Sequence, residues 1–167
     1  MLSPLLFNVY INDLSKLLNA VPAGCADVHG RINHLLYADD LCLMSTSVRG
    51  LQQLVIACEN YGSRFDIVFN CEKSMCMYFL PFRVRRAGDV YLYGNVLQCV
   101  DSFVYLGHLI SASLSDNDDI RRQLSLFYVR SNILIRSFSK FSIDVKRCLF
   151  FAFCYSCYLL LLAVGCV

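Results

Sequence analysis

Charged residues are scarce in this chain of 167 residues: they make up 17% of it, against about a quarter in typical soluble domains. The chain also lacks internal repeats and low-complexity linkers, which excludes a repeat array. Hydrophobic residues make up 57%, and the length suits one domain with at most a small appendage. This composition indicates extensive burial, a surface covered by a partner, or a membrane segment.

A secretory signal and a zinc-binding pattern are also missing. The N-terminal run MLSPLLFNVYINDL has no charged region before its apolar residues, and Pro4, Asn8 and Asn12 interrupt it. Among ten cysteines, Cys154 and Cys157 form one close pair, with no second pair or histidine near it in sequence. We therefore expect reduced thiols in an intracellular protein of the nucleus or cytoplasm.

Hydrophobic periodicity predicts helices that alternate with short strands over the first two thirds of the chain, an α+β pattern with one covered sheet. The first predicted helix covers residues 5–18, with Ser3 as N-cap and Pro4 at the first helical position. A second has an apolar stripe from Leu51 to Tyr61 and ends at Gly62. Strands are predicted at residues 65–69, 74–79 and 103–110, with a hairpin around Gly94 and Asn95.

The stretch LLYADDLCL, residues 35–43, places two neighbouring carboxylates inside an apolar run. Alternation predicts a β-hairpin over residues 34–44, with Ala38, Asp39 and Asp40 at the turn. Two buried, unpaired like charges would raise the pKa of at least one carboxyl group. A solvated turn avoids that cost, and so does a divalent cation bound to the pair. The hairpin alone leaves both interpretations open.

The final third has a one-sided charge. A helix capped by residues 116–119 has an apolar stripe from Ile120 through Leu124, Phe127 and Leu134 to Phe138, and a second helix is expected to start at residue 142. Residues 121–147 hold seven basic residues and one acid, Asp144. Contact with phosphate groups and a plain solvated face are the two interpretations. The basic residues are Arg121, Arg122, Arg130, Arg136, Lys140, Lys146 and Arg147.

Four segments in a fixed order resemble the reverse transcriptases of non-LTR (LINE-class) retrotransposons: LSPLLFNVYINDL, LLYADDLCLMS, FNCEKSMCMYF and FVYLGHLIS. Two further segments, DDIRRQLSLFYVRSNILIRSF and SIDVKRCLFFAFC, extend the resemblance to about residue 158. The resemblance implies a partial polymerase palm over residues 1–111, with an antiparallel sheet, a YADD hairpin and packed helices. It implies an all-helical, thumb-like segment over residues 112–167.

The implied activity is RNA-directed DNA polymerisation by two-metal nucleotidyl transfer. The implied partners are an RNA template, a DNA primer and deoxynucleoside triphosphates, and the implied cofactor is Mg²⁺ or Mn²⁺. By position, Asp39 would be a metal ligand and Asp40 a weaker ligand, because adjacent residues do not aim both carboxylates the same way. Tyr37 would lie beneath the primer terminus. Lys73 would lie near the departing pyrophosphate, although a solvated turn lysine is the alternative.

The resemblance assigns nucleic-acid contacts to three further places. Ser3 and Pro4 would begin the segment under the template and the incoming nucleotide, although they also suffice as a simple helix start. Leu106 and Gly107 would form the turn that grips the primer, although Gly107 also suits any backbone turn. The basic helices would face the duplex backbone, with contacts from Arg121, Arg122, Arg130 and Lys146.

The sequence departs from the family pattern in two respects. Two-metal chemistry needs a further carboxylate, which in this family lies upstream of the segment that begins with Ser3 and Pro4 (the SP segment). The nearby acids Asp13, Asp27 and Asp66 do not lie in a matching sequence context. We therefore expect no unaided polymerisation. Residues 148–167 carry no charge, which suits either a thumb helix or a membrane span. Three hypotheses follow: a fragment of a reverse transcriptase, a non-catalytic nucleic-acid-binding remnant, or a small tail-anchored membrane protein.

Overall fold

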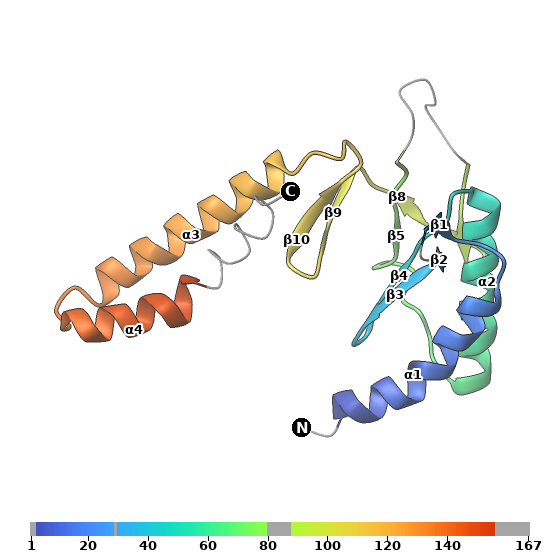
Figure 1. The fold of residues 1–167 in the computed structure, drawn as a ribbon, viewed down its shortest axis with the longest axis horizontal. Coiled ribbons are helices and arrows are strands. Elements are labelled where there is room, and N and C mark those ends of the chain that lie inside the picture. Colours follow the sequence, from blue (N-terminus) through green and yellow to red (C-terminus); the bar gives the residue numbers. More distant parts are fainter. Residues whose placement is uncertain (1–2, 29, 80–87, 156–167) are drawn as a thin grey trace. The chain divides into compact units, whose positions relative to one another are not determined.

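The computed structural model describes residues 3–28, 30–79 and 88–155, except for the side chains of residues 3–8 and 27. The chain divides into two compact units, Met1–Val100 and Asp101–Val167. Its elements mix helices with short strands (Figure 1), so the predicted mixed α and β class is confirmed. The functional division into residues 1–111 and 112–167 stays a prediction.

Two helices carry the first unit: α1 (Ser3–Ala20) and α2 (Val48–Phe65). The start of α2 matches its sequence, because the Ser47 side chain accepts a hydrogen bond from the Gly50 N–H at 3.1 Å. The predicted end at Gly62 is wrong. Asp66 adopts the left-handed cap conformation (φ 54°), and its N–H bonds back to the Gly62 carbonyl. Likewise α1 already includes Ser3, which was predicted to lie just outside the helix.

Within the described residues, the strands form two-stranded ladders, and the single antiparallel sheet that we predicted is absent. The parallel pair β5–β8 was not predicted, and its strands have only two residues each. In the first unit the other ladders, β1–β2, β3–β4 and β6–β7, are antiparallel hairpins. The strands are β1 (Cys25–Asp27), β2 (Gly30–Ile32), β3 (His34–Tyr37), β4 (Asp40–Leu43), β5 (Met75–Cys76), β6 (Tyr91–Leu92), β7 (Asn95–Val96) and β8 (Gln98–Cys99).

Two further strand predictions need correction. Residues 65–69 form no strand: Phe65 is the last residue of α2, where its ring packs against Tyr10 and Tyr61. Of residues 74–79, only those of β5 are in a strand. The β6–β7 hairpin turns at Tyr93 and Gly94, one residue earlier than predicted. Both have positive φ, as a type I′ turn requires, and the Glu59 side chain accepts a hydrogen bond from the Tyr93 N–H.

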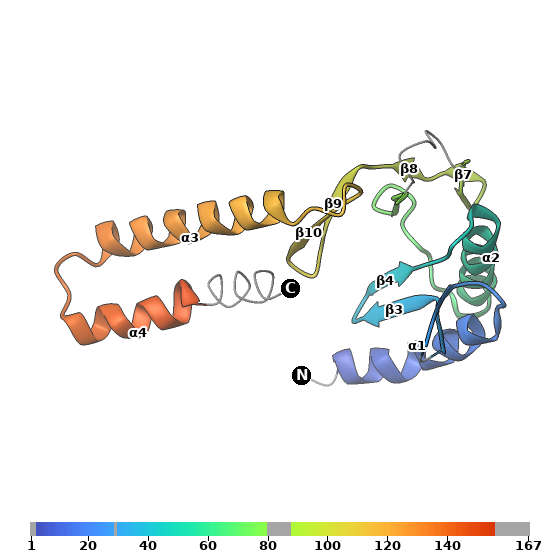
Figure 2. The same cartoon turned by 45° about the horizontal axis from the view of Figure 1, so that its top comes forward.

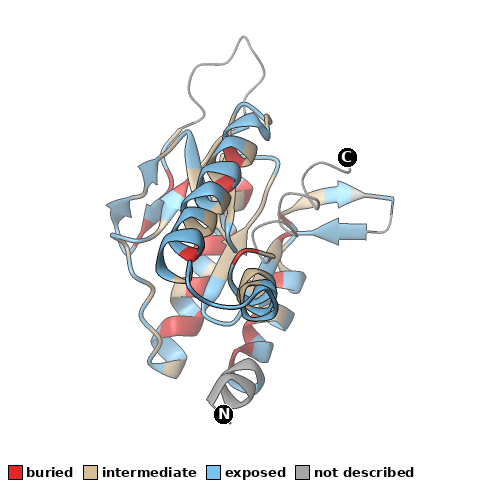
Figure 3. Ribbon diagram, turned by 90° about the vertical axis from the view of Figure 1, so that its left-hand side faces the viewer, coloured by how far each residue is buried: buried red, intermediate tan, exposed pale blue. Residues whose placement is uncertain are grey.

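Helix α2 lies between two hydrophobic clusters of the first unit. Leu54, Cys58 and Tyr61 belong to one cluster, together with residues of α1, and Val55 belongs to the other, together with residues of β5 and β6. Most of the buried residues lie on helices, and longer exposed stretches separate them along the chain (Figure 3). The first cluster is Ile11, Leu14, Leu18, Ala23, Leu54, Cys58 and Tyr61, and the second is Val55, Cys76, Val90 and Leu92.

The second unit consists of the hairpin β9 (Ser102–Tyr105) and β10 (His108–Ser111), followed by α3 (Asn117–Ser137) and α4 (Ile143–Phe153). Periodicity predicted a single strand over residues 103–110, which is wrong: the positive-φ residues Leu106 and Gly107 turn the chain back, as the resemblance implied. Helix α4 follows Ser142, as predicted. Of the predicted stripe on α3, only Leu134 is buried. No helix among the described residues is both long and apolar enough to span a membrane, and residues 156–167 of the uncharged run lie outside them.

Candidate functional site

The paired acids lie at the tip of the β3–β4 hairpin. Tyr37 pairs with Asp40 in the ladder, so the turn consists of Ala38 and Asp39, and Asp40 opens β4 instead of belonging to the turn. Ala38 has a φ of 50°, and Asp39 is not in that region. A positive φ at the first turn residue alone is the sign of a type II′ turn, which usually has glycine there. The hairpin thus holds Asp39 and Asp40 at its tip at some cost in backbone strain.

The two carboxylates at the tip are free to bind a ligand. Both residues are exposed, and neither side chain has a hydrogen bond or an ion pair within the described part of the chain. The neighbouring Tyr37 is also exposed, at 64% of its surface. Because water surrounds the pair, the like charges carry little burial cost, which keeps the solvated-turn interpretation open beside the metal interpretation.

The base of this hairpin, by contrast, is fixed by a hydrogen-bonded relay to α1. The Asn33 side-chain amide donates to the Leu18 carbonyl at 2.6 Å, so its Oδ1 accepts from His34 Nδ1 at 2.7 Å. His34 Nε2 then accepts from the Ser15 hydroxyl at 2.8 Å. Partial burial lowers the pKa of His34, which favours the neutral ring that this relay needs. Asn33 itself is 1% exposed.

Apolar side chains of β3 and β4 also hold this hairpin in place. Leu36, Leu41 and Leu43 pack against the first hydrophobic cluster. In two views the hairpin tip points toward the N-terminal half of α1 (Figure 2), the half that begins with Ser3 and Pro4. The SP segment and the paired acids therefore come together at one end of the first unit, although the side chains of Ser3 and Pro4 lie outside the described set.

The acids at the tip fit part of a magnesium site. Mg²⁺ is usually held by one or two carboxylates, with waters and substrate phosphates as the other ligands. Asp39 and Asp40 supply such oxygens. In the described ranges no group of three or more histidine, cysteine, aspartate or glutamate residues lies close enough to hold a metal ion. A pair of metal ions would therefore need a further acidic ligand besides these two.

Lys73 occupies a separate, well-defined turn between α2 and β5. The Asn70 side chain accepts hydrogen bonds from the Glu72 N–H at 2.9 Å and the Lys73 N–H at 3.1 Å, and Ser74 closes the turn onto the Asn70 carbonyl. This is an Asx-type turn that points the lysine into solvent. Among the described residues no hydrogen bond or ion pair joins Lys73 to the β3–β4 hairpin.

The second unit holds a network that the sequence analysis missed. Asp119 is almost fully buried, at 2% exposed. Its carboxylate accepts from the Leu109 N–H at 3.0 Å, His108 Nδ1 at 3.1 Å and Arg122 Nη2 at 2.8 Å. Arg122 and Gln123 also donate to the Gly107 carbonyl. Burial alone would raise the pKa of Asp119, but these hydrogen bonds outweigh it and hold that pKa below its usual value.

The predicted phosphate-contacting cations differ in how free they are. Arg122 binds Asp119, Arg130 binds the Phe153 carbonyl at 3.2 Å and stacks on its ring, and Lys146 binds the Ser139 carbonyl at 2.8 Å. Arg121 has only a long contact of 3.9 Å with exposed Asp118. Three cations outside our predicted set, Arg136, Lys140 and Arg147, are exposed and have no partner within the described residues.

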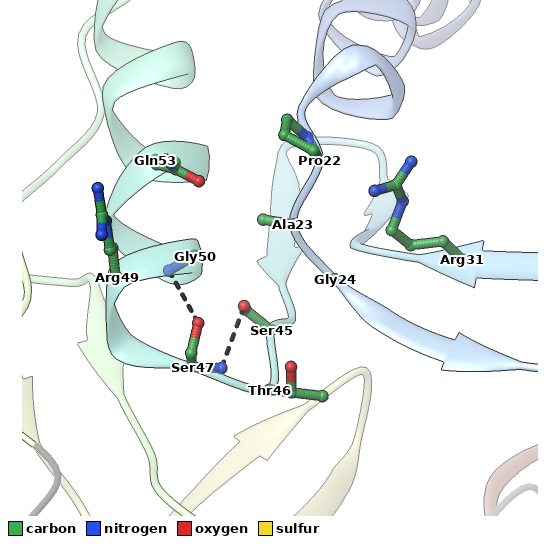
Figure 4. Close-up of a pocket in the computed structure, with 10 residues that line it drawn as sticks. All are labelled: Pro22, Ala23, Gly24, Arg31, Ser45, Thr46, Ser47, Arg49, Gly50 and Gln53. Atoms are coloured by element: carbon green, nitrogen blue, oxygen red, sulfur yellow. Dashed lines mark hydrogen bonds between the residues drawn. The ribbon is translucent and has the colours of Figure 1, made fainter.

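A polar pocket of about 230 Å³ lies in the first unit, between the residues that precede β1, Arg31 of β2 and the start of α2. Figure 4 shows Arg31 and Arg49 on opposite sides of it, and hydroxyls at its floor that serve the helix cap. No pattern in the sequence predicted this pocket. Its lining residues are Pro22, Ala23, Gly24, Arg31, Ser45, Thr46, Ser47, Arg49, Gly50 and Gln53.

Comparison with known proteins gives a match to a family model. Residues 1–110 match the family model described as "Reverse transcriptase (RNA-dependent DNA polymerase)". Neither the curated proteins nor the solved structures that were searched gave a match. The matched range contains the α1 segment, the paired acids, Lys73 and the Leu106–Gly107 turn, and it covers well over half of the chain. The chain therefore belongs to the reverse transcriptase family.

Proposed function

We propose that this chain is a fragment of the reverse transcriptase of a LINE-class retrotransposon, comprising part of the palm and the start of the thumb. In this proposal Asp39 and Asp40 are the metal-binding carboxylates of nucleotidyl transfer. The observation that carries it is the β3–β4 tip, where two exposed carboxylates have no partner within the described residues while a partly buried hydrogen-bonded relay fixes the base. A rigid support under a free acidic tip is what a metal site requires.

The residues of the chain would share the work as follows. Asp39 and Asp40 hold the cation, and Mg²⁺ or Mn²⁺ when bound neutralises charge at the reacting phosphate. Tyr37, the ladder partner of Asp40, supports the primer terminus. Lys73, which has no partner within the described residues, places a positive charge toward the leaving pyrophosphate. Ser3 and Pro4 at the start of α1 support the template and the incoming nucleotide.

A direct test is binding of Mn²⁺, followed by paramagnetic broadening of backbone amide signals in the full chain. We expect broadening centred on the amides of residues 37–40 and its loss in Asp39→Asn. Asp101→Asn, which removes the same charge from an exposed residue of the second unit, is the control. Equal broadening in wild type and Asp39→Asn would exclude the proposed metal site.

Polymerisation by the isolated chain is a separate question. Because the described residues offer no third acidic ligand near the pair, we propose that residues 1–167 do not extend a primer by themselves. The test is extension of a DNA primer on an RNA template in Mg²⁺ and in Mn²⁺. Extension that disappears in Asp39→Ala would contradict this part of the proposal and establish a complete active site.

The second candidate is a nucleic-acid-binding protein without catalysis. The observation that favours it is the set of exposed cations Arg136, Lys140 and Arg147, at the end of α3, in the loop that follows and in α4, which have no partners in the described part of the chain. Asp39 distinguishes the two candidates. Binding of an RNA–DNA duplex should survive Asp39→Ala in both, whereas specific Mn²⁺ binding at the β3–β4 tip exists only in the first.

A further inference from the structure

We propose that the first two turns of α3 are a clamp for the β9–β10 turn, with Asp119 and Arg122 as positioning residues. The proposal rests on the proposed function, in which Leu106 and Gly107 contact the primer, and it assigns the residues that would hold this contact in place. The family match ends at residue 110, so it assigns no role to Asp119 or Arg122.

The clamp begins with a buried carboxylate that is fully paired. Asp119 Oδ1 accepts from the Leu109 N–H at 3.0 Å and from Arg122 Nε at 3.1 Å and Nη2 at 2.8 Å. Its other oxygen contacts His108 Nδ1 at 3.1 Å. A buried carboxylate is stable only when its oxygens are paired in this way, so its partners hold one another in a single arrangement.

The clamp reaches the turn through one carbonyl oxygen. Arg122 Nη2, already bound to Asp119, also donates to the Gly107 carbonyl, and Gln123 Nε2 donates to the same oxygen at 2.9 Å. Asp119 thus orients Arg122, and Arg122 orients the peptide of Gly107. A two-residue turn needs only its ladder hydrogen bonds, so these additional bonds serve to fix the turn against α3.

The opposite side of this turn is open. A Cβ placed on Gly107 would meet no atom within 4 Å, and Leu106 is 46% exposed. Both residues have positive φ. The backbone is therefore held by α3 through the Gly107 carbonyl and the Leu109 N–H, while Leu106 is half exposed and open space lies next to the Gly107 Cα. Fixing one side and exposing the other is the arrangement of a rigid contact surface.

The first experiment needs no ligand. Amide hydrogen exchange in the full chain should show the Leu109 amide protected, and Asp119→Ala should raise its exchange rate at least tenfold together with that of Gly107. Amides in the second half of α3 should stay unchanged. Asp118→Asn, the same loss of charge on the exposed neighbour, should change nothing. Protection that persists in a folded Asp119→Ala variant would overturn the clamp.

The second experiment tests positioning. An RNA–DNA duplex with 4-thiothymidine at the primer 3′ end is cross-linked by light, and the yield at residues 105–108 is compared with total duplex affinity. We expect Asp119→Ala to lower that yield about fivefold while affinity changes less than twofold, and Arg122→Ala to lower the yield by a similar factor. Asp119→Asn should restore part of it, because its amide oxygen can still accept from Leu109 and Arg122.

The outcomes separate the two proposals. If wild type binds no duplex, or cross-links elsewhere, the proposed primer contact fails, and the exchange data still decide the clamp. If wild type cross-links at the turn and a folded Asp119→Ala variant does so equally, the positioning role is excluded. Should Asp119→Ala not fold, Arg122→Lys serves instead, because it keeps the charge but cannot hold Asp119 and the Gly107 carbonyl together with one planar group.

Discussion

Ala38 shows how much of the candidate site depends on one backbone conformation. Its φ of 50° is sterically unfavourable for any residue with a side chain, and alanine has no polar group to compensate for it. The strain lies directly beside Asp39, at the tip that carries the proposed metal ligands. Such local strain is typical of functional sites, where the surrounding structure maintains it.

We therefore predict that Ala38→Gly stabilises the chain by about 1 kcal/mol, because glycine adopts this conformation without a steric cost. Urea denaturation of the full chain measures the difference. Ala57→Gly, in the middle of α2, should have the opposite sign by a similar amount, because helix interiors disfavour glycine. Equal destabilisation by both substitutions would show that Ala38 is not strained.

The sequence predicted the acidic pair of the candidate site but not the exact turn or the burial of Asp119. The acidic pair and the hairpin around it could be read from alternation in LLYADDLCL, because strand periodicity is a local property. The predicted turn was one residue too long, since nothing in the sequence showed that Asp40 would pair with Tyr37 and begin β4. Asp119 was interpreted as a helix cap, because its burial depends on contacts with Leu109 and His108 that periodicity does not reveal.

At the scale of elements, α2 packs against the β3–β4 hairpin, and a close backbone contact near its end requires glycine at position 62. Gly62 lies inside the helix, where the following segment folds back so closely that an added Cβ would meet the Ile67 carbonyl oxygen at 2.4 Å. The sequence suggested a helix end there, because glycine commonly ends helices. The structural requirement is instead close approach of the backbone, which is the other use of glycine.

Gly62→Ala should therefore destabilise the chain by about 1–3 kcal/mol through steric overlap, despite alanine's higher helix propensity. The exposed neighbour Ser63 provides the control, since Ser63→Ala should be close to neutral. Thermal unfolding followed by circular dichroism compares both with wild type. A stabilised Gly62→Ala variant would mean that the backbone moves aside at little cost.

The contact between α3 and the β9–β10 hairpin should respond to acid. The folded pKa of Asp119 is lower than that of an unfolded aspartate, so the folded state binds fewer protons. Its contribution to stability is present above the usual aspartate pKa of about 4 and is lost as pH falls through the folded value. The charged or titratable groups that face it are His108 and Arg122.

Asp119→Asn should consequently lower stability near neutral pH and weaken its dependence on pH below about 5. Urea denaturation at a series of pH values, with the exchange of the Leu109 amide as the local probe, measures both effects. Asp118→Asn should leave the slope nearly unchanged, because Asp118 is exposed and only distantly paired with Arg121. A variant slope equal to that of wild type would contradict the assigned pKa direction.

At the scale of the whole molecule, the count of basic residues overstates the charge available to a ligand. The sequence predicted a nucleic-acid surface from seven cations between residues 121 and 147. Arg122, Arg130 and Lys146 have intramolecular partners, which the sequence could not show because those partners are backbone carbonyls and a buried acid. Arg136, Lys140 and Arg147 remain exposed without partners among the described residues.

For duplex binding we therefore predict that Lys140→Ala and Arg147→Ala together reduce the slope of log K against log salt by about two, since each phosphate contact contributes about 0.9. Arg130→Ala is the matched control, a loss of one cation that is already engaged with Phe153. Its slope should stay within about 0.3 of wild type. A larger loss of slope in Arg130→Ala than in the double variant would reverse this assignment.

The ladders of the described residues have one more consequence. Each contains two strands, so every strand in them has one side whose amides and carbonyls are not bonded across a ladder. Such sides can recruit strands from other molecules during refolding. The yield of native monomer should fall steeply with protein concentration, so dilute refolding, or a peptide that occupies a free edge, would improve recovery.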